Sequence, residues 1–121
     1  EHEGARLERA RLALEAGEPE EASALCSALL ERDPRSHRAH LLRGQARFAL
    51  GRLEDAFADF QEAVALDGGF LGHLWRGRAH QALGRWAEAE DDLIEAIDLD
   101  PSRPEGYFRR AELHAARREY E

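Results

Sequence analysis

Four amino acids are missing from this chain of 121 residues: it contains no lysine, asparagine, threonine or methionine, so all 17 basic residues are arginine. β-Branched side chains are rare as well, since only Val64, Ile94 and Ile97 occur. Strands are enriched in β-branched residues, whereas alanine, leucine, arginine and glutamate, which dominate here, are strong helix formers. The composition therefore excludes an all-β or parallel-sheet fold and predicts an all-α protein.

The chain also lacks a basic charge balance, a long apolar run and a second cysteine. Its net charge of −8 argues against nucleic acid as a partner. No apolar run approaches the roughly 20 residues that a membrane-spanning helix needs, so no membrane insertion is expected. Cys26 cannot form an internal disulfide, and the charged N-terminus has no signal-peptide core, so the cytoplasm is the default predicted location. Because the first residue is not methionine, we expect a segment of a longer protein.

A regular spacing of glycines organises what is present. Gly17, Gly51 and Gly84 are 34 and 33 residues apart, and each follows a stretch with helical spacing of apolar residues. The fifth residue after each glycine is an alanine (Ala22, Ala56, Ala89). The seventeenth residue after each glycine is the second residue of an Asp-Pro or Asp-Gly pair (Pro34, Gly68, Pro101). Such a period indicates a repeat architecture of helix pairs, in which the glycine adopts the left-handed conformation that ends the first helix.

This pattern resembles the tetratricopeptide repeat, a unit of two antiparallel helices. The matching positions are the small residue of the first helix, the glycine between the helices, the second-helix alanine and the closing proline (Ala10, Gly44, Gly77, Ala111; Gly17, Gly51, Gly84; Ala22, Ala56, Ala89; Pro34, Pro101). The resemblance implies a right-handed solenoid of antiparallel helix pairs. One domain, 1–121, would hold three units at about 3–36, 37–69 and 70–103, and then a capping or truncated fourth repeat at 104–121.

Several charged residues recur with the repeat. The residue just before each small position is an arginine (Arg9, Arg43, Arg76, Arg110), and we expect these arginines to form ion pairs with carboxylates between helices. An anion-binding stripe is the alternative. The acidic run in the third repeat is predicted to be a solvated outer face (Glu88, Glu90, Asp91, Asp92, Glu95, Asp98, Asp100).

Residues suited to catalysis or metal binding are few. His40 and His73 occupy equivalent repeat positions, and neighbouring helices could bring them together at a metal, but periodicity alone accounts for their recurrence. Cys26 lies in an apolar helical stretch and is predicted to be a core thiol rather than a nucleophile. We therefore predict no catalytic residues, no metal and no cofactor.

In tetratricopeptide arrays the first helices line a concave surface that usually takes an extended peptide or a helix. The resemblance places ten residues on this surface (Arg11, Arg38, Leu41, Gln45, Phe48, Leu74, Arg78, Gln81, Phe108, Glu112). Apolar anchors mixed with arginine donors suit a peptide that offers one or two apolar side chains and a carboxylate. The other interpretation is that Leu41 and Leu74 mainly support packing between repeats.

Chaperone-binding members of that family hold a terminal carboxylate with lysine and asparagine. In this chain Leu7, Leu41, Leu74 and Phe108 stand at the recurrent position where those lysines begin, so no such clamp is expected. The leading hypothesis is a non-catalytic adaptor or scaffold that binds a partner peptide or helix in the groove. The alternative is a module that forms a homo-oligomer through its terminal helices, with Phe108 and Leu113 exposed, and an enzyme is the third hypothesis.

Overall fold

Seven helices and the turns between them make up residues 3–120, which are the residues that the computed structural model describes. They are α1 (Glu3–Glu15), α2 (Pro19–Arg32), α3 (His37–Ala49), α4 (Leu53–Leu66), α5 (Phe70–Ala82), α6 (Trp86–Leu99) and α7 (Pro104–Tyr120). The predicted all-α class is confirmed. Residues 1, 2 and 121, which the predicted domain includes, lie outside this description.

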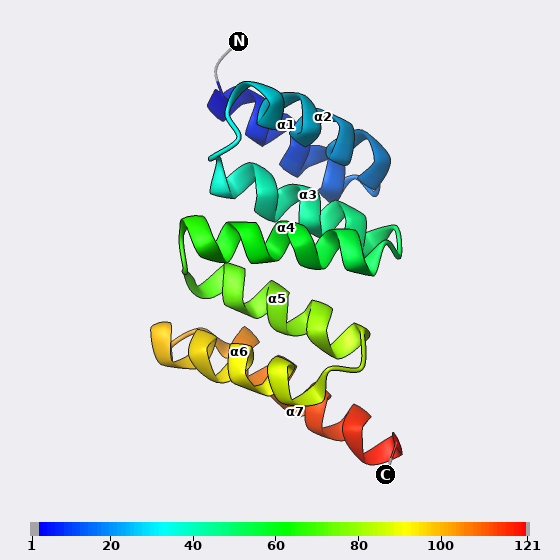
Figure 1. Cartoon of the computed structure of the whole chain (residues 1–121), viewed down its shortest axis with the longest axis vertical. Helices are drawn as coiled ribbons and strands as arrows, with labels where there is room; N and C mark the ends of the chain where they lie inside the picture. The colour runs from blue at the N-terminus through cyan, green and yellow to red at the C-terminus, as the bar shows by residue number, and fades with distance from the viewer. Residues whose placement is uncertain (1–2, 121) are drawn as a thin grey trace.

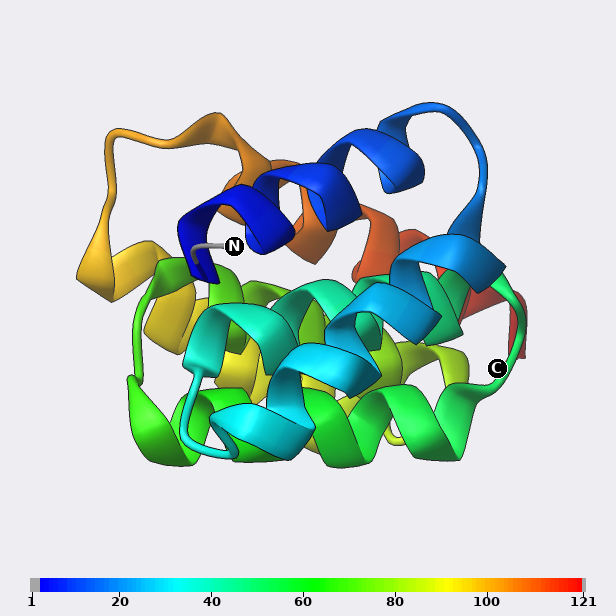
Figure 2. The ribbon, with the colours of Figure 1, turned by 90° about the horizontal axis from the view of Figure 1, so that it is seen from above.

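The helices stack in sequence order along the long axis of the molecule, with the two chain ends at opposite ends of the stack (Figure 1). Each helix packs against the next one along the chain, and the first helices of the pairs also contact one another in the order α1, α3, α5, α7. The second helices α2, α4 and α6 make no such contacts with one another among the described residues. The stack therefore curves, and its inner, concave face is made of first helices; α1 and α7 lie along one side and α4 along the other (Figure 2).

The three repeated glycines end the first helix of each pair. Gly17, Gly51 and Gly84 have φ angles of +77°, +78° and +78°, which confirms the predicted left-handed conformation. The residue after each glycine donates its backbone N–H to a carbonyl five residues earlier, for example Arg52 to Arg47 at 2.9 Å. This hydrogen bond satisfies a carbonyl that the helix end would leave free, and it turns the chain into the second helix.

Small residues allow the paired helices to pack closely. Gly44 on α3 faces the ring of Phe60 on α4, and Gly77 on α5 faces Leu93 on α6. Both large side chains are completely buried, so they fill the space that each glycine leaves. Ala111, at the equivalent position of α7, is exposed instead, because no helix follows α7 within residues 3–120.

Buried ion pairs join consecutive helices at the predicted arginine positions. The carboxylate of Asp59 on α4 is 2% exposed. It accepts hydrogen bonds from Nε and Nη2 of Arg43, at 3.0 and 2.8 Å, and from Nη1 of Arg47 at 2.9 Å, and it lies 3.2 Å from Nδ1 of His40. Arg43 also donates to Ser27 on α2 at 3.1 Å. One arginine therefore links three consecutive helices.

The next repeat builds the same network. Nε and Nη2 of Arg76 each donate to the Asp92 carboxylate at 2.8 Å, Nδ1 of His73 lies 2.9 Å from that carboxylate, and Nη1 of Arg76 donates to Gln61 on α4 at 2.7 Å. In the last pair Nε of Arg110 donates to Glu90 at 2.6 Å. Ion pairing is thus confirmed for Arg43, Arg76 and Arg110, and the histidines bind carboxylates rather than meeting at a metal.

The interpretation of the acidic run as a solvated face is wrong for Asp92. This residue is 5% exposed and lies on the side of α6 that packs against α5, directly before the fully buried Leu93. A buried carboxylate is stable there because Arg76 neutralises it. Four acidic residues of the run are exposed as predicted (Glu88, Asp91, Glu95, Asp98).

His80, near the end of α5, is buried beside this network. Within the described residues its Nδ1 has no hydrogen-bond partner, and its Nε2 lies 3.7 Å from the carboxylate of Asp92. The ring packs against Phe57, with the ring centroids 4.7 Å apart. Burial lowers the pKa of His80 below its usual value of 6.5, and the charge of Asp92 opposes this shift.

We expect the free energy of unfolding to fall as the pH drops from about 7.5 to about 5.5, in part because His80 stays neutral in the folded state while it takes up a proton in the unfolded chain. This contribution to stability is complete above the pKa that His80 has in the unfolded chain. It is lost as the pH falls towards the lower pKa that His80 has in the folded state. Urea unfolding at a series of pH values measures this. A His80→Gln variant should lose less stability over the same range, and equal losses would contradict the assignment.

Candidate functional site

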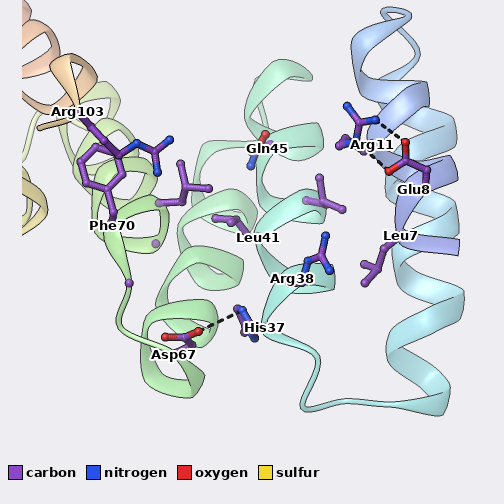
Figure 3. Close-up of a pocket in the computed structure, with 14 residues that line it drawn as sticks. Leu7, Glu8, Arg11, His37, Arg38, Leu41, Gln45, Asp67, Phe70 and Arg103 are labelled. Carbon is purple, nitrogen blue, oxygen red and sulfur yellow. Dashed lines mark hydrogen bonds and ion pairs between the residues drawn. The ribbon is translucent and has the colours of Figure 1, made fainter. Parts of the chain in front are cut away.

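The concave face holds a hollow of about 490 Å³ where α1, α3 and α5 meet (Figure 3). Its apolar lining comes from three helices, and we call this hollow the leucine pocket (Leu7, Leu41, Leu42, Phe70, Leu71). Leu7 and Phe70 are buried and form part of the core, whereas Leu71 is 36% exposed. The pocket therefore has a fixed apolar floor and an open rim.

Charged side chains surround the leucine pocket, and most are already engaged. Arg11 forms ion pairs with Glu8 and Glu15 on its own helix. Nε2 of His37 lies 3.3 Å from the carboxylate of Asp67. These pairs are partly exposed, so each contributes little to stability.

The two remaining arginines of the leucine pocket are not paired with a carboxylate on its rim. Arg103 stacks on Phe70, with its Cζ 4.3 Å from the ring centroid, and its Nε donates to Glu105, outside the pocket, at 3.3 Å. Arg38 is exposed and forms no hydrogen bond or ion pair within residues 3–120. Figure 3 shows Arg38 between α3 and α1, beside Leu7. The rim can therefore supply donors to a bound chain.

A second hollow, of about 320 Å³, lies further along α3 and α5, and we call it the aromatic pocket. Residues of α3, α5, α6 and α7 line it (Phe48, Arg78, Gln81, Ala82, Trp86, Arg109, Glu112, Tyr120). Gln45 of the leucine pocket and Phe48 of the aromatic pocket are one turn apart on α3. The two hollows thus lie next to each other along α3, and we call them together the groove.

Within residues 3–120, no group of three or more histidine, cysteine or acidic side chains is placed to hold a metal ion. Cys26 lies outside the groove in the core, and burial raises the pKa of its thiol to about 11. Its thiol therefore stays protonated and unreactive at neutral pH. No helix of the described residues is long and apolar enough to span a membrane.

Sequence models of the tetratricopeptide repeat match residues 7–69 and 70–103. The chain belongs to the tetratricopeptide repeat family. A mouse relative, FK506-binding protein-like, is 47% identical over 51 residues, which is 42% of this chain and only 15% of that protein. The chain therefore matches a small part of the length of this relative.

Solved tetratricopeptide domains have the same fold. The first such domain of human RPAP3 superposes with a TM-score of 0.88 at 24% sequence identity, covering 94% of this chain and 91% of that one. The first domain of Spaghetti (RPAP3), bound to the HSP90 peptide SRMEEVD, has a TM-score of 0.86 at 25% identity and covers 93% and 90%. The OM64 domain of Arabidopsis has a TM-score of 0.87 at 20% identity and covers 93% and 94%.

Eight of the ten residues that the resemblance placed on the tetratricopeptide groove line the two pockets. The leucine pocket includes four of them (Arg11, Arg38, Leu41, Gln45), and the aromatic pocket includes the other four (Phe48, Arg78, Gln81, Glu112). Leu74 is instead 3% exposed and packs in the core with Leu93 and Leu113, so it supports packing between helices. Phe108 is 57% exposed, is stacked with Arg109, and lines neither pocket.

Sequence reasoning missed groove residues at the junctions between helices. Phe70, at the first position of α5, and Arg103, just before α7, close one side of the leucine pocket. Trp86 and Tyr120 wall the aromatic pocket, with their ring centroids 5.5 Å apart. The repeat period could have found Trp86, because it is the first residue of a second helix, next to the glycine turn. No repeat position predicts Tyr120, because its place at the aromatic pocket depends on the direction in which α7 runs.

Proposed function

We propose that this chain is a non-catalytic interaction module that binds a peptide or helical segment of a partner protein in the groove formed by the leucine and aromatic pockets. The observation that supports this proposal most directly is the leucine pocket, an apolar hollow of about 490 Å³ with arginine donors on its rim. A segment with an apolar side chain fits the floor, and its backbone or acidic groups can accept from the rim.

The comparisons support this proposal at the level of the fold. The domain of Spaghetti (RPAP3), which is 25% identical, is bound to the HSP90 peptide SRMEEVD. The same chaperone peptide is not the partner proposed for this chain, because the chain contains no lysine or asparagine from which a clamp of the expected kind could be built. The cytoplasm stays the predicted location of the chain.

Self-association through the terminal helices has less support. Of the two residues proposed for that surface, Leu113 is 1% exposed and belongs to the core around Leu74, whereas Phe108 is 57% exposed. Tyr107 and Tyr120 on the same helix α7 are exposed as well, so this alternative rests on the exposure of aromatic side chains alone.

The test of groove binding uses peptides selected from a displayed random library against the wild-type chain, with affinities measured by fluorescence anisotropy. Leu71→Glu places a carboxylate on the rim of the leucine pocket, and we expect it to weaken binding at least about tenfold because the carboxylate is desolvated against the apolar anchor. Leu71 is 36% exposed, so the variant should fold.

The matched control is Ile94→Glu. Ile94 is also 36% exposed but lies on α6, outside both pockets, so its replacement should leave peptide affinity unchanged. Equal effects of the two substitutions, or a library that yields no binding peptide, would overturn the proposed function.

A further inference from the structure

One arginine of the groove is held in place by aromatic rings rather than by a carboxylate. Arg78 on α5 is half-buried, and its Cζ lies 4.2 Å from the ring centroid of Trp75 and 5.4 Å from that of Phe48. Phe48 and Trp75 pack edge to face, with centroids 5.8 Å apart. The planes of the two rings are 79° apart, so the guanidinium can stack flat on only one of them, and the contact with both rings restricts where it can move.

Arg78 forms no hydrogen bond or ion pair with any residue between 3 and 120. The carboxylate whose charge acts on it is that of Glu112, but Nη1 of Arg109 already holds Glu112 at 2.8 Å. Arg76, two residues earlier on the same helix, is paired with Asp92. Arg78 is thus a half-buried cation whose donors are unused.

This position is electrostatically unfavourable for a cation without a partner. Burial lowers the pKa of Arg78, the neighbouring positive charge of Arg109 lowers it further, and Glu112 offsets only part of this. An anion placed at the guanidinium edge would remove that cost. The aromatic pocket beside Arg78 has a volume of about 320 Å³, and the amide of Gln81 adds a further donor to its wall.

The charges favour a carboxylate over a phosphate. Arg78 and Arg109 supply two positive charges and Glu112 one negative charge, which leaves one net positive charge at the pocket. A carboxylate, with one negative charge, balances it. A phosphate group carries up to two negative charges and three acceptor oxygens, and it would be repelled more strongly by Glu112.

We propose that the aromatic pocket binds a carboxylate of the partner segment at the guanidinium of Arg78, while an apolar side chain of the same segment fills the leucine pocket. This inference rests on the proposed function. Leu71 of the leucine pocket and Arg78 are seven residues apart on α5, which is about 10 Å along the helix axis. An extended peptide needs at least about three residues to cover that distance.

The carboxylate can come from an acidic side chain or from the end of the partner chain. The peptides selected in the library test are therefore made in three forms: with each acidic residue in turn changed to its amide, with a free C-terminus, and with an amidated C-terminus. We expect neutralising one of these carboxylates to reduce affinity for the wild-type chain by about tenfold, since a hydrogen bond to a charged group is typically worth at least that factor. The form that loses affinity identifies the source.

A double-mutant cycle then assigns the contact. Arg78→Met removes the charge but keeps an apolar stem against Trp75, so the rings stay packed, and thermal unfolding checks that the variant folds. Against Arg78→Met, the same neutralisation should change affinity by less than about twofold. Arg78→Lys, which keeps the charge but loses the fork of donors, should retain part of the discrimination.

The control arginine is Arg38, which is exposed at the leucine pocket and is also without an ion pair in the described chain. The Arg38→Met variant should still bind the peptide with its carboxylate about tenfold more tightly than the neutralised peptide. If the discrimination is lost in Arg38→Met and kept in Arg78→Met, or if selected peptides bind without any carboxylate, the site at Arg78 is wrong while groove binding stands. If no peptide binds, the proposed function and this site fail together.

Discussion

Replacing Asp59 by alanine is expected to lower the free energy of unfolding by about 3–5 kcal/mol, the usual effect of removing one partner of a buried ion pair. Asp59 is 2% exposed and accepts hydrogen bonds from Arg43 and Arg47. Without its carboxylate, these two guanidinium groups and the ring of His40 remain between α3 and α4 with no anion. Chemical denaturation followed by circular dichroism measures the change.

Asp55→Ala is the matched control, because Asp55 is exposed in the first turn of the same helix. Its loss should lower stability by only about 0.3–1 kcal/mol, the usual contribution of an exposed carboxylate at a helix N-terminus. A similarly small effect for Asp59→Ala would mean that Arg43 and Arg47 reach solvent when the carboxylate is removed, and that the network contributes little to stability.

Gly44→Ala is expected to destabilise the chain by roughly 1–3 kcal/mol through overpacking. A Cβ atom at this position would lie 2.7 Å from Cδ1 of the Phe60 ring and closer still to its Cε1. Phe60 is completely buried, so the ring cannot move aside without disturbing its neighbours. Thermal and urea unfolding of the variant measure this cost.

The repeat provides the control for this substitution. At Gly77, the equivalent position of the next pair, a Cβ would lie 3.1 Å from the nearest atom of Leu93, so Gly77→Ala should cost less. The helix-forming tendency of alanine offsets that cost by about 0.5–1 kcal/mol. Phe60→Leu introduces the residue type that faces Gly77 in the third repeat, and combining it with Gly44→Ala should cost less stability than the sum of the two single changes. A double variant as unstable as the sum of its single changes would show that the clash is not with Phe60.

The regular part of the fold was predictable from local signals. Gly17, Gly51 and Gly84 recur at the repeat period, and a glycine in the left-handed conformation ends a helix by itself, so the turns could be placed without tertiary information. The arginines that join the helices were predictable for a related reason, because Arg43 and Arg76 recur at one position of the repeat.

Burial of individual residues was less predictable. Asp92 was expected at the surface because it lies in an acidic run, although its counterpart Asp59 stands one repeat earlier and both follow an arginine by sixteen residues. That recurrence was the available signal for a buried carboxylate. Leu74 was expected in the groove but packs in the core. Neighbouring positions of a first helix face either the groove or the second helix, and the rotation of the first helix about its own axis decides which.

The amino-acid sequence by itself determined the helix pairs, their turns and the membership in a repeat family, because these depend on interactions between residues close together in the chain. Only the tertiary structure decided which arginines are free to bind. Arg76 and Arg78 are alike in sequence and two residues apart, yet one meets Asp92 of the next helix and the other meets Trp75 and Phe48. An ion pair requires two side chains to come within about 4 Å, and helix packing alone sets that distance.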